Sequence, residues 1–261
     1  MTQVQTIARL TDAANVTGAF LGGGTLLMRD VNYAAHTIPT LIRITDPMMR
    51  EVRTEGDRLW IGAGMTMASV IAHRDLEALR SAALAIGGPA VRNMATIGGN
   101  LFAPHPYGDF TVALLALDAK VHFANGRESD LETFLRGRDQ NRDLVTAVSI
   151  QRNSGADFRF KKVTRTKPKG VSVLSIAAHL EAPGGRVKTA RVAFGAMGPT
   201  PLRAKATETA LRGASLDEGG ITPALNAVLT DLEPSDDPLA SAWYRRTVAP
   251  VHLKRLLLER R

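Results

Sequence analysis

Two glycine-rich stretches contain the residue types that could bind a ligand through the backbone. Gly22-Gly23-Gly24 is followed by Thr25, and Gly98-Gly99 lies between Thr96 and Asn100. Glycine has no Cβ to block a close approach and tolerates positive φ, so it suits backbone that must surround a ligand. One Gly-Gly pair alone more often marks an ordinary tight turn. Two stretches of the same character favour a ligand site.

The elements around these stretches determine what they could bind. A buried strand over 19–21 is expected to lead into the first stretch, with Thr25 as the N-cap of the helix that follows. A helix N-terminus beside a glycine loop presents free amides of the kind that a phosphate needs. The second stretch lies in a long shaped loop over 92–108, before a helix that begins at Asp109 as its N-cap. Amides from both loops could then hold a diphosphate between them.

The rest of the chain alternates helix and strand signals. Strands are expected at 40–44, 59–64, 121–124 and 144–150, and helices at 12–16, 66–73 (capped by Thr66) and 76–86. Asn125-Gly126 is a typical hairpin turn. After a linker at 153–157, two strands at 172–180 and 186–194 are joined by a turn at Pro183-Gly184-Gly185, and helices follow at 202–212, 222–231 and 239–259.

Other phosphate-binding and metal-binding patterns are absent from the sequence. No Gly-Lys-Ser or Gly-Lys-Thr follows either glycine stretch, and no Gly-x-Gly-x-x-Gly opens a helix, which disfavours ATP hydrolysis and the Rossmann mode. A dinucleotide held by backbone amides is still possible. The six histidines show no i, i+4 pairing on a helix, so no metal site is expected.

Composition narrows the class of protein. The chain has 261 residues, 44% of them hydrophobic, which is enough for one large domain or two modest ones. No apolar run reaches the about 18 to 20 residues of a membrane-spanning helix. The absence of cysteine excludes disulfides and iron–sulfur ligation by this chain, and fits a cytoplasmic location. The net charge of +8 comes from dispersed basic residues without interleaved aromatics, so no nucleic-acid partner is expected.

Taken together, these motifs resemble those of a known family. The first pyrophosphate loop of the family is matched by Gly22-Gly23-Gly24-Thr25, and the second by 91–93 with Ala95-Thr96-Ile97-Gly98-Gly99-Asn100-Leu101. Gly108-Asp109 and Ser241-Ala242-Trp243-Tyr244-Arg245-Arg246 also match. Over essentially its whole length, the chain resembles the FAD-binding medium subunit of molybdenum hydroxylases, the group that includes bacterial carbon monoxide dehydrogenase and xanthine dehydrogenase.

This resemblance implies a fold and a set of domains. The fold is α+β, with a PCMH-type FAD-binding domain of two subdomains followed by a small C-terminal domain of antiparallel sheet and helices. The first domain is expected over 1–153, with subdomains at about 1–55 and 56–153, and the second over 158–261.

The resemblance also implies cofactor-binding residues. The two loops would hold the pyrophosphate, Thr96 and Asp109 would contact the phosphate, ribose or adenosine end, and Ile86 with Gly87 would form an apolar wall. Phe160 stands where the family often has tyrosine, and Lys161 or Lys162 would lie near the flavin, although a surface role for Lys161 is equally compatible with its position. The full expected set is Leu21, Gly22, Gly23, Gly24, Thr25, Leu26, Leu27, Ile86, Gly87, Thr96, Ile97, Gly98, Gly99, Asn100, Phe102, Asp109, Phe160 and Lys161. Valine at Gly98 is expected to fill the pyrophosphate position.

The implied function is electron transfer. FAD in this chain would accept electrons from a small subunit with two [2Fe-2S] clusters and pass them to an external acceptor, while a large subunit with the molybdenum cofactor acts on the substrate. The assembly would be a heterotrimer or a dimer of heterotrimers. Two alternatives are a stand-alone FAD-dependent oxidoreductase of the same superfold and a basic, non-enzymatic binding module.

Overall fold

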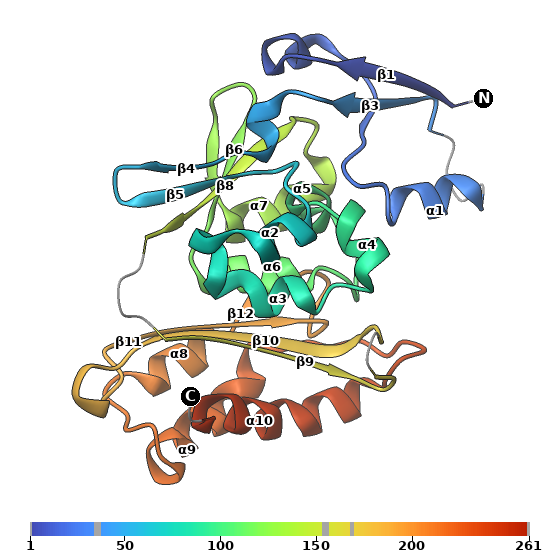
Figure 1. The fold of residues 1–261 in the computed structure, drawn as a ribbon. Coiled ribbons are helices and arrows are strands. Elements are labelled where there is room, and N and C mark those ends of the chain that lie inside the picture. The colour runs from blue at the N-terminus through green and yellow to red at the C-terminus, as the bar shows by residue number, and fades with distance from the viewer. Residues whose placement is uncertain (1, 34–37, 153–156, 168–169, 260–261) are drawn as a thin grey trace. The chain divides into compact units, whose positions relative to one another are not determined.

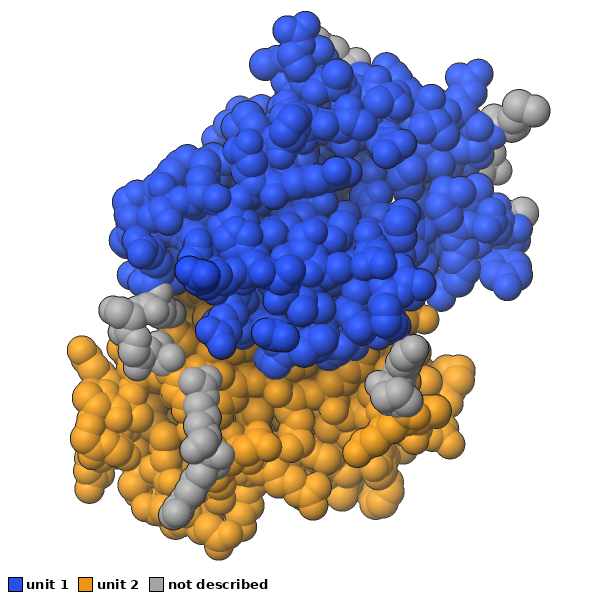
Figure 2. Space-filling view, viewed as in Figure 1, with its two compact units in different colours: residues 1–103, 119–152 blue, residues 104–118, 153–261 orange. Residues whose placement is uncertain are grey.

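The computed structural model of the chain describes residues 2–33, 38–152, 157–167 and 170–259 (Figure 1). The chain folds into two compact units (Figure 2): unit 1 contains residues 1–103 and 119–152, and unit 2 contains residues 104–118 and 153–261. Most of the expected linker, 153–156, lies outside the described residues. No described helix is both long enough and apolar enough to cross a membrane.

A small parallel sheet carries the first glycine loop in unit 1. Its strands are β1 (Gln3–Ile7), β2 (Ala19–Phe20) and β3 (Thr40–Ile44), in the order β1-β3-β2. The 3-10 helix η1 (Leu10–Asn15) precedes β2, and α1 (Leu27–Asn32) follows the loop. The sequence predicted β3 and the approximate position of β2, which is half-buried rather than buried. It missed β1, in which only Ile7 is buried.

A five-stranded antiparallel sheet forms the rest of unit 1. Its order is β4-β5-β8-β6-β7, with β4 (Val52–Glu55), β5 (Arg58–Gly62), β6 (Lys120–Phe123), β7 (Glu128–Asp130) and β8 (Val145–Gln151). The predicted turn at Asn125-Gly126 joins β6 to β7, and Gly126 has φ of +80°. The remaining helical segments of unit 1 are η2 (Pro47–Arg50), α2 (Met67–Ala72), η3 (Arg74–Leu79), α3 (Arg80–Leu84), α4 (Pro89–Met94), α5 (Ile97–Leu101), α7 (Leu131–Gly137) and η4 (Arg138–Gln140). As predicted, Thr66 caps α2 by accepting a hydrogen bond from the amide of Ser69.

Unit 2 is built on an antiparallel sheet of order β12-β11-β10-β9. The strands are β9 (Asp157–Thr164), β10 (Ser172–Glu181), β11 (Thr189–Gly195) and β12 (Leu202–Arg203). The turn between β10 and β11 is η5 (Pro183–Gly185), as predicted. The other elements of unit 2 are α6 (Asp109–Ala116), α8 (Lys205–Leu211), α9 (Glu218–Ala227), η6 (Val228–Thr230) and α10 (Ala242–Leu258).

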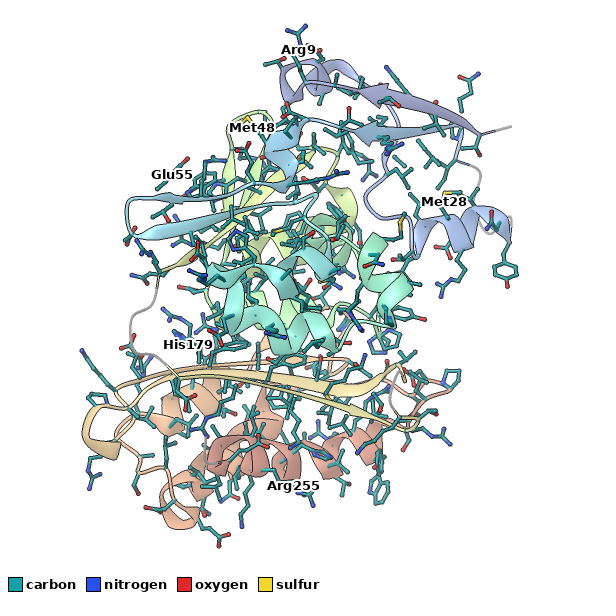
Figure 3. The ribbon with its side chains drawn as sticks, in the orientation of Figure 1. Arg9, Met28, Met48, Glu55, His179 and Arg255 are labelled. Atoms are coloured by element: carbon teal, nitrogen blue, oxygen red, sulfur yellow. The ribbon has the colours of Figure 1, made fainter. Side chains whose placement is uncertain are left out.

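The two faces of the unit 2 sheet are covered differently. Leu174, Ile176 and Phe194 lie in the apolar core that the sheet shares with α8, α9 and α10 (Figure 1). Side chains alternate along a strand, so His179 of β10 lies on the other face; Figure 3 labels it together with Arg255 of α10. Helix α6 packs on that other face, where a Cβ at Gly195 would lie 2.7 Å from Val112 Cγ2. The α+β prediction is confirmed.

Candidate functional site

The first glycine loop connects β2 to α1. The amide of Leu21 still donates to Ile42 O of β3 at 2.7 Å, and the amide of Met28 donates to Gly24 O at 3.0 Å. Gly24 has φ of +68°, a left-handed conformation that favours glycine. The prediction that Thr25 caps the following helix is wrong: the cap position is Leu26, without a side-chain hydrogen bond. The helix therefore begins at Leu27, one residue downstream of the predicted start.

Six consecutive amides in this loop have no acceptor among the described residues. From Gly22 to Leu27, no backbone N–H group makes a hydrogen bond to any part of the protein that the structure describes. Gly22 and Thr25 are exposed, and the residues between them are half-buried. A run of successive N–H groups around a tight bend is a favourable environment for an anion. The loop can therefore donate to phosphate oxygens.

The second glycine stretch is helical, which corrects the prediction of one long loop over 92–108. Gly98 and Gly99 lie in the one-turn helix α5, and Thr96 is its N-cap, accepting a hydrogen bond from the amide of Gly99 at 3.1 Å. The amide of Gly98 donates to Ala63 O at 2.7 Å, and that of Ile97 donates to Met65 O at 3.0 Å. Amides 97–99 thus have acceptors inside the chain. The prediction that both loops offer free amides holds only for the first loop.

The structure brings the two glycine stretches together, as the sequence predicted. A Cβ added at Gly23 would lie 1.7 Å from Met94 O, and one added at Gly22 would lie 2.6 Å from Thr96 Oγ1 and 3.6 Å from Gly99 N. Backbone therefore meets backbone where any larger residue would collide. The free amides of the first loop lie beside the N-terminal turn of α5.

Gly98 has a different role from the one expected. Its Cβ position faces the interior, 3.1 Å from Ala63 O and 3.2 Å from Ala63 Cβ. A valine at Gly98 would press on the strand connection after β5 instead of filling the pyrophosphate position. Gly99 is exposed, and its Cβ position meets only Thr96 Oγ1, at 3.1 Å. Gly99 is exposed at this surface, whereas Gly98 is half-buried.

The other expected residues of unit 1 lie at the ends of short helices. Ile86 and Gly87 follow α3, and Arg92 Nη1 donates to both of their carbonyl oxygens, at 3.2 and 2.7 Å. Phe102 ends α5, is 41% exposed and packs edge-on against Phe134 with ring centroids 5.4 Å apart. Asn100 is half-buried within α5. Ile86 and Gly87 thus precede Thr96 by ten and nine residues, and Phe102 follows Asn100 by two.

Asp109 belongs to a buried polar cluster in unit 2. Its Oδ1 accepts a hydrogen bond from Ser172 Oγ at 2.6 Å, and its Oδ2 pairs with Lys162 Nζ at 2.9 Å. The predicted N-cap role is wrong, because Asp109 is the first helical residue and the cap is Gly108 with φ of +104°. The carboxylate is therefore engaged by a hydroxyl and an ammonium group rather than by helix amides.

Lys161 and Lys162 point to opposite faces of the sheet. Lys161 opposes Ile176 of β10 and so shares the face covered by α10. Burial, together with nearby cations that include Lys161, lowers the pKa of His252 on α10. Phe160 and Lys162 lie on the other face, where Lys162 makes the ion pair with the carboxylate of α6. Phe160 and Lys162 therefore lie on the same sheet face as the polar cluster around Asp109, and Lys161 does not.

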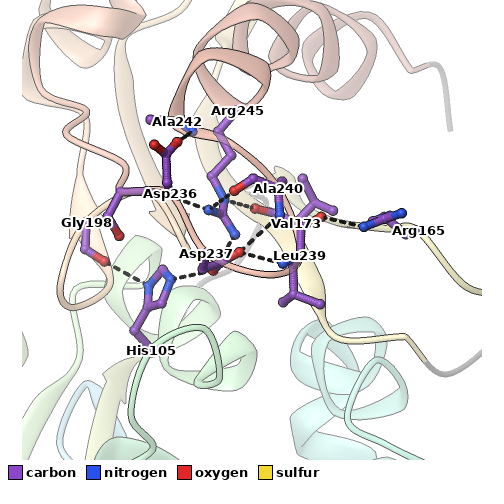
Figure 4. A network of polar contacts seen from close by, with 11 residues as sticks. His105, Arg165, Val173, Gly198, Asp236, Asp237, Leu239, Ala240, Ala242 and Arg245 are labelled. Atoms are coloured by element: carbon purple, nitrogen blue, oxygen red, sulfur yellow. Dashed lines mark hydrogen bonds and ion pairs between the residues drawn. The ribbon is translucent and has the colours of Figure 1, made fainter.

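A second polar network in unit 2 was missed by sequence reasoning (Figure 4). Arg245 is fully buried and donates to Val173 O, Ser235 O and Ala240 O at 2.7 to 2.9 Å, and to Asp237 Oδ2 at 2.7 Å. His105 Nε2 lies 3.0 Å from the same carboxylate oxygen. The sequence signal that could have indicated this network is Arg245 itself, a charged residue on the apolar face of the last helix.

The charge of Asp237 is stabilised within this network. Partial burial alone would raise the pKa of its carboxyl, but hydrogen bonds from Arg245, the amide of Ala240, His105 and the amide of Leu239 outweigh burial and hold the pKa below its ordinary value. The carboxylate therefore stays ionised, and the loop that precedes α10 is fixed. Among the described residues, no group of three acidic or histidine side chains is placed to hold a metal ion.

Comparison with known proteins identifies both halves of the chain. Residues 1–151 match the family described as FAD binding domain in molybdopterin dehydrogenase, and residues 158–260 match the CO dehydrogenase flavoprotein C-terminal domain. The glyceraldehyde dehydrogenase medium chain of Sulfolobus acidocaldarius is 30% identical over 173 residues, which are 64% of this chain and 61% of that protein. The match thus spans about three-fifths of the length of that relative.

Two further relatives come from Hydrogenophaga pseudoflava. Its carbon monoxide dehydrogenase medium chain is 29% identical over 226 residues, 81% of this chain and 77% of that one. The solved structure of its carbon monoxide dehydrogenase lacking the Mo-pyranopterin moiety matches with a TM-score of 0.91 and 25% identity, over 98% of this chain and 96% of that chain. The chain belongs to the family of FAD-binding domains of molybdopterin dehydrogenases, matches the CO dehydrogenase flavoprotein C-terminal domain over residues 158–260, and is an FAD-binding medium subunit of the molybdenum hydroxylase type.

Proposed function

We propose that this chain binds FAD as the electron-transfer subunit of a molybdenum hydroxylase, accepting electrons from a [2Fe-2S] subunit and passing them from FAD to an external acceptor. The observation that carries the proposal is the run of six amides, from Gly22 to Leu27, without an acceptor in the described part of the chain. A pyrophosphate supplies acceptor oxygens and negative charge for such a run. The family match of residues 1–151 supports the same assignment.

The residues of unit 1 fit the diphosphate part of FAD. The first loop would donate hydrogen bonds, and the surface of Gly22 and Gly99, where a side chain would intrude, would allow the diphosphate to approach closely. The rest of the binding surface would be formed by Leu21, Leu26, Leu27, Asn100 and Phe102. An adjoining apolar wall would be formed by Ile86 and Gly87. The bound flavin would supply the redox chemistry, and the protein would supply its binding and orientation.

Two residues of unit 2 are proposed to act toward the flavin. Lys162 is held by Asp109, and Phe160 is two residues away on the same sheet face. A cation held in a fixed position can stabilise negative charge that develops on a reduced ring system. Lys161 faces the helices of unit 2, so we assign it a structural role instead.

The wider assembly follows from the same proposal. The FAD-binding domain would occupy 1–153, with subdomains at about 1–55 and 56–153, and the C-terminal domain would occupy 158–261. The partners would be a large subunit with the molybdenum cofactor and a small subunit with two [2Fe-2S] clusters, assembled as a heterotrimer or a dimer of heterotrimers in the cytoplasm. Because the chain has no cysteine, cluster ligation by thiolates must come from another chain.

Two measurements test this function. The full chain, purified alone and stripped of flavin, is titrated with FAD, and we expect saturable binding with restoration of the visible flavin spectrum. The copurified complex is then reduced with its substrate, and we expect bleaching of this flavin only when the [2Fe-2S] subunit is present. A chain that fails to bind FAD contradicts the proposal. Turnover of a small alcohol by the isolated flavoprotein would favour the stand-alone oxidoreductase instead.

A further inference from the structure

A buried arginine lies behind the second glycine stretch. Arg138, the first residue of η4, is only 6% exposed, and its Nη1 donates to Leu101 O at 3.2 Å and to Ala103 O at 2.9 Å. These carbonyls belong to the end of α5 and the residues just after it, where a helix leaves acceptors without intrahelical partners. Arg138 therefore caps the C-terminal end of the helix whose N-terminal end carries Thr96 and Gly99.

Burying the charged guanidinium of Arg138 costs free energy of hydration. A buried guanidinium loses hydration, and burial lowers the pKa of Arg138. Its Nε has no hydrogen-bond partner in the described part of the chain. The carboxylate of Asp139 lies 3.5 Å from Nε, and the side chain of Asp139 is 84% exposed. The buried cation is thus stabilised by the two carbonyl groups that its Nη1 binds.

The same helical segment contacts α5 a second time. Phe134 lies four residues before Arg138, on the same side of the segment. Its ring meets that of Phe102 edge-on, at 5.4 Å between centroids. The pair Phe134 and Arg138 thus holds both the side chain and the carbonyl groups at the end of α5.

Helix α5 needs such support. It contains five residues, two of them glycine, and a helix of one turn is unstable in isolation. Hydrogen bonds to Ala63 O and Met65 O fix its first turn, and Arg138 fixes its last. With both ends held, the backbone of Thr96 and Gly99 stays against the first glycine loop.

We propose that Arg138 is a positioning residue for FAD: by holding the carbonyls at the end of α5, it keeps the second glycine stretch in register with the amides that bind the diphosphate. This inference rests on the proposed FAD-binding function and adds a residue that contacts neither glycine stretch. It predicts that Arg138 affects FAD affinity without touching FAD.

The test compares FAD dissociation constants of the flavin-free full chain. We expect Arg138→Met to weaken FAD binding by at least about tenfold, since charge-assisted hydrogen bonds of this kind are lost. Arg138→Lys retains the charge and can reach one carbonyl, so its FAD affinity should lie between that of the native chain and that of Arg138→Met. Leu131→Ala is the matched control: it removes buried packing from α7, the helix directly before η4, but leaves both hydrogen bonds in place. Its affinity should stay within about twofold of the native value.

A second readout separates positioning from general instability. Amide hydrogen exchange over 97–102 in the flavin-free chain should be faster in Arg138→Lys than in native protein, and unchanged in Leu131→Ala. If Arg138→Met does not fold, Arg138→Lys decides the question by both measurements. Native FAD affinity in the Arg138 variants, or equal losses in all three variants, overturns the inference. Failure of the native chain itself to bind FAD would instead refute the proposed function.

Discussion

Replacing Gly23 by alanine should disrupt the contact between the two glycine stretches. The new Cβ would lie 1.7 Å from Met94 O and 2.4 Å from Met94 C, whereas real Cβ contacts essentially never fall below 3.0 Å. The two backbones must therefore separate by at least about 1.3 Å, the difference between these distances. The obstacle is backbone on both sides, so no side-chain rotation relieves it.

The expected magnitude follows from that displacement. Overpacking of this kind destabilises a folded domain by about 1 to 3 kcal/mol. A misplacement of about 1 Å in a positioned site can reduce its effectiveness by about two orders of magnitude. We therefore expect the FAD dissociation constant of Gly23→Ala to rise between about tenfold and one hundredfold, with a lower melting temperature of unit 1.

The assay is FAD titration of the flavin-free chain, combined with thermal unfolding. Gly137→Ala is the matched control, because a Cβ at Gly137 meets nothing within 4 Å and its φ of −113° suits alanine. This control should bind FAD normally and be as stable as native protein or slightly more so. If Gly23→Ala retained both native affinity and native stability, the close contact between the stretches would not exist in solution.

Three further outcomes are expected. Lys162→Met should destabilise unit 2 by about 1 to 3 kcal/mol in chemical denaturation, because it leaves the buried carboxylate of Asp109 with only a hydroxyl partner; unchanged stability would argue against the pair. Burial lowers the pKa of both His122 and His179, so the unfolded chain binds more protons below about pH 6.5, and the melting temperature should fall from pH 7 to pH 5; replacing both by glutamine should flatten that fall, and an unaltered slope would contradict this cause. Asp237→Asn should lower the free energy of unfolding by about 3 to 5 kcal/mol, because it removes the counter-ion of the buried Arg245 guanidinium. A native-like denaturation curve would exclude this role for Asp237.

Some local signals were read correctly from the sequence, whereas the helix caps predicted at Thr25 and Asp109 were wrong. Thr66 as a helix cap and Asn125-Gly126 as a hairpin turn depend on interactions within four residues, so the chain encodes them locally. The first strand, by contrast, has no apolar alternation, and it forms because β3 pairs with it along its whole length. Helix α7 was also missed, although its buried residues lie at helical spacing.

The second glycine stretch shows why the site was only partly predictable. Two adjacent glycines disfavour a helix by about 1 kcal/mol each relative to alanine, so a loop was the better expectation. Hydrogen bonds to Ala63 O and Met65 O, some thirty residues earlier in the chain, reverse that preference. Similarly, nothing in the sequence relates Gly23 to the carbonyl of Met94. Long-range backbone contacts of this kind leave no local pattern.

The two glycine stretches therefore contribute in different ways to the proposed site. In the part of the chain that the structure describes, the amides from Gly22 to Leu27 have no acceptor, while those at the N-terminus of α5 have acceptors within the chain. The second stretch limits how far the first loop can approach it, because Gly22 and Gly23 lie directly against its backbone and the Thr96 side chain. Binding energy that would otherwise order the donors is then retained as affinity. On this reasoning, loosening α5 should weaken FAD binding even when every donor amide is intact.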